Sequence, residues 1–161
     1  MSFIPRVTEK AHELIAREFD DRGPNACMTD IIEHLERHNP ELLDMAARCA
    51  GDLPNERKAM LGFGMFYRLL ILASARAGAL MPLPRVSAET RTLLVAEIDN
   101  KGSEDFTKEG ITELEKSNPE LLQMAHNFAS GIGDYLHAMQ GFALLYKSLL
   151  IQQKADRARL H

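Results

Sequence analysis

The chain has 161 residues, of which 45% are hydrophobic and 26% are charged, and its formal net charge is −4 at pH 7. This composition is typical of a globular protein with one or two domains. The acidic balance argues against a nucleic-acid-binding protein, because neutralising phosphates needs a basic face. Cys27 and Cys49 form no C-x-x-C motif and predict no disulfide framework, so we expect both to be small buried residues.

The N-terminal residues lack the apolar segment of a signal peptide. The most apolar window, residues 60–75, is about 16 residues long and contains Arg68, whereas a membrane-spanning helix needs about 20 apolar residues. We therefore expect a cytoplasmic protein without a membrane partner.

The chain aligns with itself without a gap when Pro5 is placed on Pro84. In this alignment the sequence PRV at residues 5–7 recurs at residues 84–86, and the sequence NPELL at residues 39–43 recurs at residues 118–122. About two dozen positions are identical, against about five expected by chance from ordinary composition. We interpret residues 1–79 and residues 80–161 as two copies of a duplicated unit.

Each copy predicts four helices, and no segment has the alternating pattern of strands joined by hairpin turns. The first helix covers residues 8–22, with Thr8 as its N-cap and Gly23 as its C-terminal stop. Ser87 and Gly102 have the same places in the second copy. The expected buried stripes are Leu14, Ile15 and Phe19 in the first copy and Leu93, Leu94 and Ile98 in the second.

The second helix covers residues 28–38 and the third covers residues 40–51. Asn39 is a suitable N-cap for the third helix, and Pro40 suits the first helical position, where no N–H partner is needed. Residues 78–84 form a short connector between the copies, stiffened by proline. The expected apolar stripe of the second helix is Met28, Ile31, Ile32 and Leu35.

The fourth helix, residues 54–75, is the most apolar element, and its spacing puts four side chains on one stripe that recurs in the second copy. Gly62 and Gly141 recur on it too, and because glycine costs about 1 kcal/mol in a helix, we expect helices to approach closely there. The two stripes are Met60, Phe63, Tyr67 and Leu70, and Met139, Phe142, Tyr146 and Leu149. We expect one face of the second copy to meet water through Gln140, Lys147, Ser148 and Gln152.

The sequence therefore predicts an all-α protein made of two homologous four-helix units. We expect the units to pack about a pseudo-twofold axis as one helical bundle with a shared core. A helix as apolar as residues 60–75 needs burial on several sides, which one unit of this size cannot supply. Two separate four-helix domains are the alternative arrangement.

Arg68 and Lys147 stand at equivalent places in apolar runs, beside Tyr67 and Tyr146. A basic side chain in an apolar helix has to reach solvent, pair with a carboxylate or hold a ligand. We expect structural pairing, and we keep these four residues as candidate ligand or partner contacts. The acidic residues that both copies share are Glu18, Glu36, Glu97 and Glu115.

His34 and His38 are spaced i, i+4, which can place two imidazoles on one metal ion. The second copy lacks both histidines and this helix has no HExxH pattern, so an exposed helix face is the favoured interpretation. Glu9-x-x-His12 has a spacing found in di-iron bundles, but no second such motif lies at the equivalent position. The sequence contains no nucleophile elbow or phosphate-binding loop, and we expect neither a metal nor a cofactor.

These patterns favour a non-enzymatic interaction or regulatory protein that presents an apolar face or groove to a protein partner. Leu61 and Met65 are the candidate contacts on the apolar helix, and the same face could pair two copies in a homodimer. The alternative is a small-molecule sensor or enzyme with a pocket between the two long helices. A nucleic-acid-binding regulator is the third hypothesis, although Arg48 is the only basic residue of the third helix.

Overall fold

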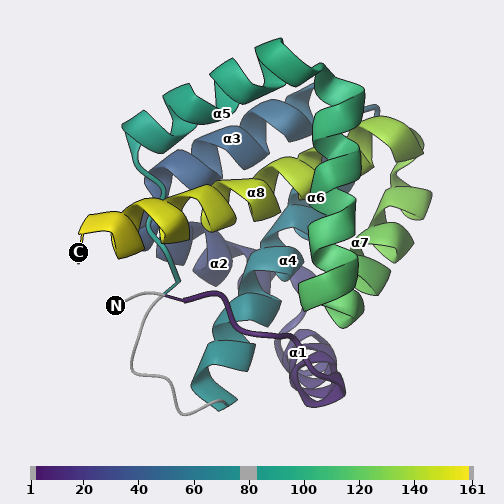
Figure 1. Cartoon of the computed structure of the whole chain (residues 1–161). Helices are drawn as coiled ribbons and strands as arrows, with labels where there is room; N and C mark the ends of the chain where they lie inside the picture. Colours follow the sequence, from purple (N-terminus) through teal and green to yellow (C-terminus); the bar gives the residue numbers. More distant parts are fainter. Residues whose placement is uncertain (1–2, 77–82, 160–161) are drawn as a thin grey trace.

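The computed structural model describes residues 3–76 and 83–159, and every regular element within these ranges is an α-helix. The prediction of an all-α bundle is therefore confirmed (Figure 1). Most of the predicted connector, residues 78–82, lies outside the described residues. In chain order the helices are α1 (Glu9–Arg22), α2 (Pro24–His38), α3 (Pro40–Gly51), α4 (Glu56–Arg76), α5 (Ala88–Lys101), α6 (Ser103–Ser117), α7 (Pro119–Ile132) and α8 (Tyr135–Arg159).

The helices of the two halves start at aligned positions. In the self-alignment of the sequence, the first residue of each helix from α5 to α8 pairs with the first residue of the corresponding helix from α1 to α4. The residues that end α1 and α5 have nearly equal backbone angles, with φ 85° at Gly23 and 86° at Gly102. Only glycine adopts such a positive φ without strain, so both helices stop where predicted. α2 begins at Pro24, earlier than the predicted start at Met28. Proline fits the first helical turn because the N–H groups there have no partner within the helix, so the missing N–H of proline costs no hydrogen bond.

α4 and α8 cross at the centre of the molecule (Figure 1). Aromatic rings from both helices are in contact there. The rings of Phe63 and Phe142 pack edge to face with centroids 4.8 Å apart, and Phe66 lies 5.6 Å from Phe142. Such ring pairs contribute about 0.5–1.5 kcal/mol each beyond the burial of their area. The two predicted stripes are buried, except for Met60, which is half-buried.

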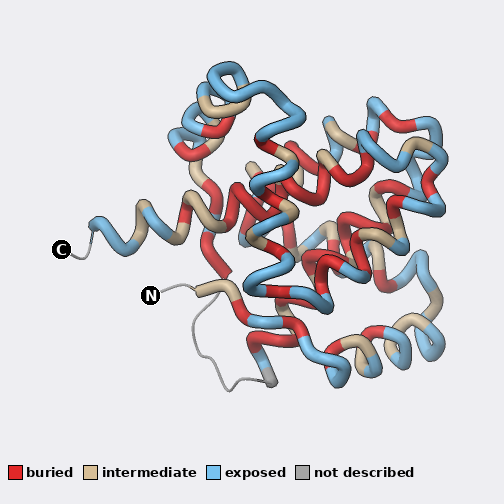
Figure 2. Tube along the Cα trace, turned by 45° about the vertical axis from the view of Figure 1, so that its right-hand side comes forward, coloured by how far each residue is buried: buried red, intermediate tan, exposed pale blue. Residues whose placement is uncertain are grey.

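The hydrophobic core contains residues from both halves. One cluster of buried hydrophobic side chains includes members of every helix from α1 to α8. Figure 2 shows buried residues along the inward faces of the helices and exposed residues along the outward faces. Within the described residues, one stretch, Glu56–Ala75, is long and apolar enough to cross a membrane, with a mean hydropathy of 1.3. However, 56% of the window tested is buried inside the fold, and a core helix of a globular protein passes the same test.

Gly62 and Gly141 make room for aromatic rings. A Cβ atom at Gly62 would lie 3.2 Å from Cδ1 of Phe128 on α7, and one at Gly141 would lie 2.7 Å from Cζ of Phe63 on α4. The close approach that the glycines predict is therefore between a helix backbone and a side chain, and not between two backbones.

One predicted core residue of α5 is exposed. Leu93 is expected in the buried stripe, but it is 56% exposed. Thr90 and Leu94 take the inward positions of this helix and are both 1% exposed. Because neighbouring residues on a helix point about 100° apart, Leu93 and Leu94 cannot both face one narrow core contact.

The polar residues of α8 do not form the water-facing surface that the sequence predicts. Lys147, Ser148 and Gln152 are 7%, 0% and 3% exposed. The Ser148 hydroxyl donates to the carbonyl oxygen of Leu144, and Oε1 of Gln152 accepts the N–H of Ser87 at 3.0 Å. These side chains are stable in the interior because each has a hydrogen-bond partner.

Asn39 and Asn118 join the two halves reciprocally. At the start of α3, Asn39 donates from Nδ2 to the carbonyl oxygen of Pro84 at 2.9 Å and accepts the N–H of Val86 at 2.8 Å. At the start of α7, Asn118 makes the same pair of bonds to residues 5–7, at 3.1 and 2.6 Å. Neither side chain caps its own helix, contrary to the prediction. We call these two buried contacts the Asn39 bracket and the Asn118 bracket.

Candidate functional site

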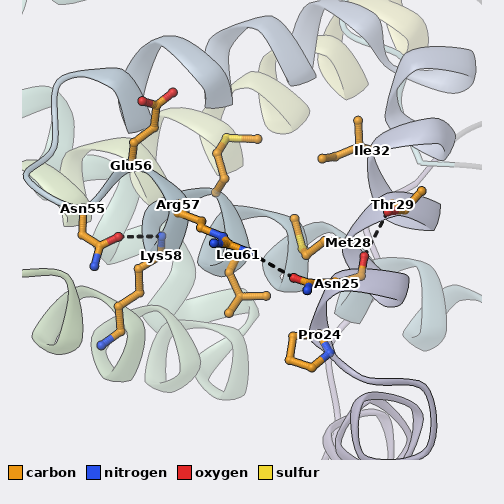
Figure 3. Close-up of a pocket in the computed structure, with 11 residues that line it drawn as sticks. Pro24, Asn25, Met28, Thr29, Ile32, Asn55, Glu56, Arg57, Lys58 and Leu61 are labelled. Atoms are coloured by element: carbon orange, nitrogen blue, oxygen red, sulfur yellow. Dashed lines mark hydrogen bonds between the residues drawn. The ribbon is translucent and has the colours of Figure 1, made fainter.

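An open groove with a volume of about 920 Å³ lies between α2 and the start of α4 (Figure 3). We call it the α2–α4 groove. Ligand pockets commonly have volumes of about 300–1,000 Å³, so the groove can accept a ligand or the side chains of a partner. Its lining residues are Pro24, Asn25, Met28, Thr29, Ile32, Asn55, Glu56, Arg57, Lys58, Met60 and Leu61.

The floor of the α2–α4 groove is apolar and half-buried. Met28 and Ile32 lie about one turn apart on one side of α2, and Met60 and Leu61 line the groove from α4. Met28 extends over Gly64, where an added Cβ atom would lie 2.7 Å from the methionine methyl carbon. Two flexible methionines give the floor a shape that can adapt to what it binds.

The rim of the groove is polar and exposed. The N–H of Lys58 donates to Oδ1 of Asn55 at 3.0 Å, so Asn55 caps the start of α4. Arg57 reaches toward α2 and donates to Oδ1 of Asn25 at 3.4 Å (Figure 3). Within the described part of the chain, neither Arg57 nor Lys58 forms an ion pair. With Glu56 as the only acidic lining residue, the rim carries a net positive charge on an otherwise acidic protein.

The equivalent place in the second half, beside α6 and α8, holds a smaller cavity. Its volume is about 170 Å³, and Thr107 and Gln140 are among its lining residues. The self-alignment of the sequence pairs these two residues with Met28 and Leu61. Two of the four apolar floor residues thus have polar counterparts in the second half.

A cluster of charged and polar side chains lies on the other side of α2, and it confirms one predicted ion pair. Arg68 on α4 donates from Nε and Nη2 to the carboxylate of Glu18 on α1, at 3.3 and 3.2 Å. Arg22 pairs with Asp30 on α2 and with Glu18. These residues and Tyr67 line a small cavity of about 180 Å³.

The Tyr67 hydroxyl lies 2.9 Å from Nδ1 of His34. Burial raises the pKa of Tyr67 to about 12, although a hydrogen bond from the Asn39 side chain works in the opposite direction. Burial also lowers the pKa of His34, and the positive charges of His38 and Arg68 lower it further. At pH 7 this contact therefore joins a neutral phenol to a neutral imidazole.

Lys147 has the equivalent position on α8 and confirms the second predicted pairing. Its Nζ donates to Oε1 of Glu97 at 3.2 Å and to Oε2 of Glu109 at 3.0 Å, and it lies 4.3 Å from the ring centroid of Phe106. The Tyr146 hydroxyl accepts a hydrogen bond from the neighbouring Asn118 bracket, at 3.1 Å. Lys147 is 7% exposed, so it acts as a buried structural cation. The other shared acidic residues, Glu36 and Glu115, are exposed.

The described residues include no group of three or more His, Cys, Asp or Glu side chains placed to hold a metal ion. The rings of His34 and His38 do lie close together, with centroids 4.4 Å apart. Cys27 is buried as expected, while Cys49 is half-buried. Burial raises the pKa of Cys49 to about 11, so its thiol is protonated at neutral pH and is a weak nucleophile.

The structure separates the two apolar contacts that the sequence predicts. Leu61 lines the α2–α4 groove, whereas Met65 is half-buried against the core. Met28 and Ile32 are predicted as buried core residues but belong to the groove floor. Met28 and Ile32 are spaced i, i+4 on a different face of α2 from Ile31, and this spacing is the feature of the sequence that could have predicted the groove.

Comparisons with family models, curated proteins and solved structures found no match. The function therefore has to be inferred from the geometry of the site itself.

Proposed function

We propose that this protein is a non-enzymatic interaction protein whose α2–α4 groove receives a short amphipathic helix of a protein partner. The observation that supports this proposal is an apolar, half-buried floor inside an exposed polar rim, at a volume of about 920 Å³. Binding a helix in a groove uses this combination, because the floor accepts apolar anchors and the rim fixes their orientation.

The dimensions of the groove define the partner segment. From Pro24 to Ile32 the wall on α2 is about 12 Å long, at about 1.5 Å per residue, which matches about two turns of a bound helix. Such a helix would place apolar side chains at i and i+3 or i+4 over Met28 and Leu61. Since Arg57 and Lys58 have no carboxylate partner within the described residues, the bound helix should carry acidic residues beside its apolar stripe.

A pull-down from lysate with mass spectrometry, using the full chain as bait, identifies proteins to test. Wild type is compared with Leu61→Glu, which puts a charge in the floor, and with Gln140→Glu, a matched change at the equivalent position of the second half. Circular dichroism checks that both variants are folded. A partner of the groove is retained by wild type and Gln140→Glu and is lost with Leu61→Glu.

The binding segment of that partner is then synthesised and titrated against the full chain. We expect binding to weaken at least about tenfold in Arg57→Glu and with added salt, because the acidic helix would lose its cationic contacts. Partners that bind Leu61→Glu as well as wild type would contradict the proposal. Sedimentation that shows dimers in wild type and monomers in Leu61→Glu would instead identify a second copy of this chain as the occupant.

A small-molecule sensor or enzyme is the second candidate, and the cavity beside Tyr67 favours it. The cavity has polar walls that include Arg68 and His34, but its volume of about 180 Å³ is below the usual range for ligand pockets. A small polar ligand that raises the melting temperature of wild type and not of Tyr67→Phe would support this function over the first.

We further propose that the halves arose by duplication and pack about a pseudo-twofold axis. The equal spacing of helix starts, the reciprocal Asn brackets and the equivalent cations Arg68 and Lys147 all support this relation. Matched substitutions at Asn39 and Asn118 test it, because equivalent brackets should give equal losses of stability.

A further inference from the structure

The second half has its own cavity at the place equivalent to the small cavity beside Tyr67. It is lined by residues of α5, α6 and α8 and has a volume of about 550 Å³, against about 180 Å³ in the first half. Ligand pockets commonly have volumes of about 300–1,000 Å³, so of these two cavities this one has the size of a ligand pocket. We call it the Lys147 cavity. The self-alignment of the sequence pairs Glu18, Asp30, His34, Arg68 and Ile71 with its lining residues Glu97, Glu109, Glu113, Lys147 and Leu150.

One wall of the Lys147 cavity is a network of paired charges. Lys147, which is 7% exposed, donates to the carboxylates of Glu97 and Glu109 at 3.2 and 3.0 Å. Lys101 donates to the same two carboxylates, at 2.6 Å each. Two cations thus balance two carboxylates. Oε2 of Glu97 is nevertheless buried without a hydrogen-bond partner within the described residues, so this wall has an acceptor that the network does not use.

Three other charged side chains of the same cavity are not paired. Glu113 follows Glu109 by one turn on α6, and Lys154 and Arg157 lie one turn apart near the end of α8. In the part of the chain that the structure describes, none of these three side chains forms an ion pair or a hydrogen bond. The cavity therefore carries a free negative charge on one helix and free positive charges on another.

An apolar surface separates the two kinds of charge along α8. Leu150 and Ile151 are half-buried and follow Lys147 toward Lys154. From Lys147 to Lys154 the helix rises about 10 Å, at about 1.5 Å per residue. An extended peptide of three residues has about the same length, at about 3.3–3.6 Å per residue.

We propose that the Lys147 cavity binds a short peptide with free ends, about three residues long and apolar in the middle. Its terminal ammonium group donates to Glu113 and to the unused Oε2 of Glu97, and its terminal carboxylate accepts from Lys154 and Arg157. Its central apolar side chain covers Leu150 and Ile151 and removes them from water. Binding is non-covalent, and the two ends fix the direction of the peptide in the cavity.

The first half lacks both ends of this site. His34 stands at the position equivalent to Glu113, and Ala75 stands at the position equivalent to Lys154. The cavity beside Tyr67 therefore has neither the free carboxylate nor the free cation that the two ends of a peptide need, and it is about a third as large.

An NMR titration of the full chain with the tripeptide Ala-Leu-Ala, into the millimolar range, tests the proposal. We expect saturable shifts of amide signals in α6 and α8 around the Lys147 cavity. Peptides with an acetylated N-terminus or an amidated C-terminus should bind roughly threefold to tenfold more weakly, because each loses one charged contact. Free leucine should also bind more weakly, since it is too short to reach both ends.

Two variants assign the ends of the peptide, and a third is the matched control. Glu113→Gln should weaken binding of the unmodified peptide without weakening the acetylated peptide further, and Lys154→Ala should act in the same way toward the amidated peptide. Lys116→Ala removes an exposed cation of α6 that does not line the cavity, and it should bind like wild type. Circular dichroism checks that all three variants are folded.

The proposal is overturned if the shifts do not saturate, or if both capped peptides bind as tightly as the unmodified one. Shifts along α2 and the start of α4 that disappear in Leu61→Glu would overturn it too, because they would place the peptide in the α2–α4 groove. Equal binding of free leucine and of Ala-Leu-Ala would contradict the proposed length and identify the ligand as an amino acid.

Discussion

The two halves share one framework of helices, yet they differ in what the framework presents to solvent. Between α2 and α4 the first half has a groove of about 920 Å³ with an apolar floor. The corresponding cavity of the second half has a volume of about 170 Å³, and Thr107 and Gln140 stand there in place of Met28 and Leu61. Conversely, the second half buries Lys147 and Gln152 in hydrogen-bonded contacts, where the first half has Arg68, which is half-buried, and Ala73.

This contrast separates the contacts that hold the framework from those that give each half its properties. The Asn brackets, the glycines at the ends of α1 and α5 and the crossing aromatic rings occur on both sides. The groove floor, its cationic rim and His34 occur on one side. The binding surface that we propose for a protein partner therefore belongs to the first half.

The largest expected effect comes from the Asn brackets. Asn39→Ala and Asn118→Ala each leave one buried carbonyl and one buried N–H without a partner, and an unsatisfied group costs about 1–3 kcal/mol. Asn118→Ala also removes the hydrogen bond to the Tyr146 hydroxyl. We expect each variant to lose about 3 kcal/mol of unfolding free energy in urea at pH 8. Losses that differ by more than about 1.5 kcal/mol would show that the two brackets are not equivalent.

Replacing the glycines of the long helices with alanine should change the stability less than the Asn substitutions do. The two glycine variants should also differ from each other. In Gly141→Ala the new methyl group would overlap the ring of Phe63, which is only 2% exposed, and we expect a net loss of about 1–2 kcal/mol. In Gly62→Ala the half-buried ring of Phe128 can move, and alanine gains about 1 kcal/mol of helix propensity. The melting temperature of Gly62→Ala should be equal to or higher than that of wild type.

Removing the buried cation of the second half, Lys147, should reduce stability more than removing its half-buried counterpart, Arg68. Lys147→Met leaves Glu97 with only Lys101 as a charged partner, and we expect a loss of about 1–2 kcal/mol. Arg68→Met should lose less, about 0.5 kcal/mol, because the Arg68 side chain is 30% exposed and solvent screens its pair.

The effect of Lys147→Met on stability has a defined pH dependence. Burial raises the pKa of Glu97, but hydrogen bonds from Lys101 and Lys147 outweigh it and hold that pKa below its usual value. The stabilisation is therefore present above the unfolded pKa near 4.3 and disappears as the pH falls through the folded pKa. Urea midpoints of wild type and Lys147→Met should converge below about pH 4, and a constant difference would show that the pairing with Glu97 is not its cause.

The sequence allowed the helices to be predicted because their signals are local. Gly23 and Pro40 mark the ends and starts of helices through their own backbone preferences, so their effects need no distant partner. The pairing of Arg68 with Glu18 could be anticipated as well, since pairing with a carboxylate is one of the three ways to keep a cation in an apolar helix. All-α architecture follows directly from these features.

The α2–α4 groove could not be predicted in the same way, because it depends on which helix faces which. Met28 and Ile32 belong to an apolar helix face, and only the position of α4 leaves them half-buried at a groove. Gln152 has the composition of a surface position, but its partners are Ser87, the N-cap residue of α5, and Thr90 on α5. Asn39 is a residue type that commonly caps helices, but the hydrogen-bond partners of its side chain lie 45 and 47 residues away in the sequence.

The Asn118 bracket also constrains how the protein can be made. The residues that Asn118 holds, Pro5 and Val7, precede it by 113 and 111 positions. At a ribosomal rate of about 5–20 residues per second, the start of the chain waits about 6–22 seconds before this partner is synthesised. Until then the segment before α1 lacks these two hydrogen bonds, so this closing contact forms only after α6 has been synthesised.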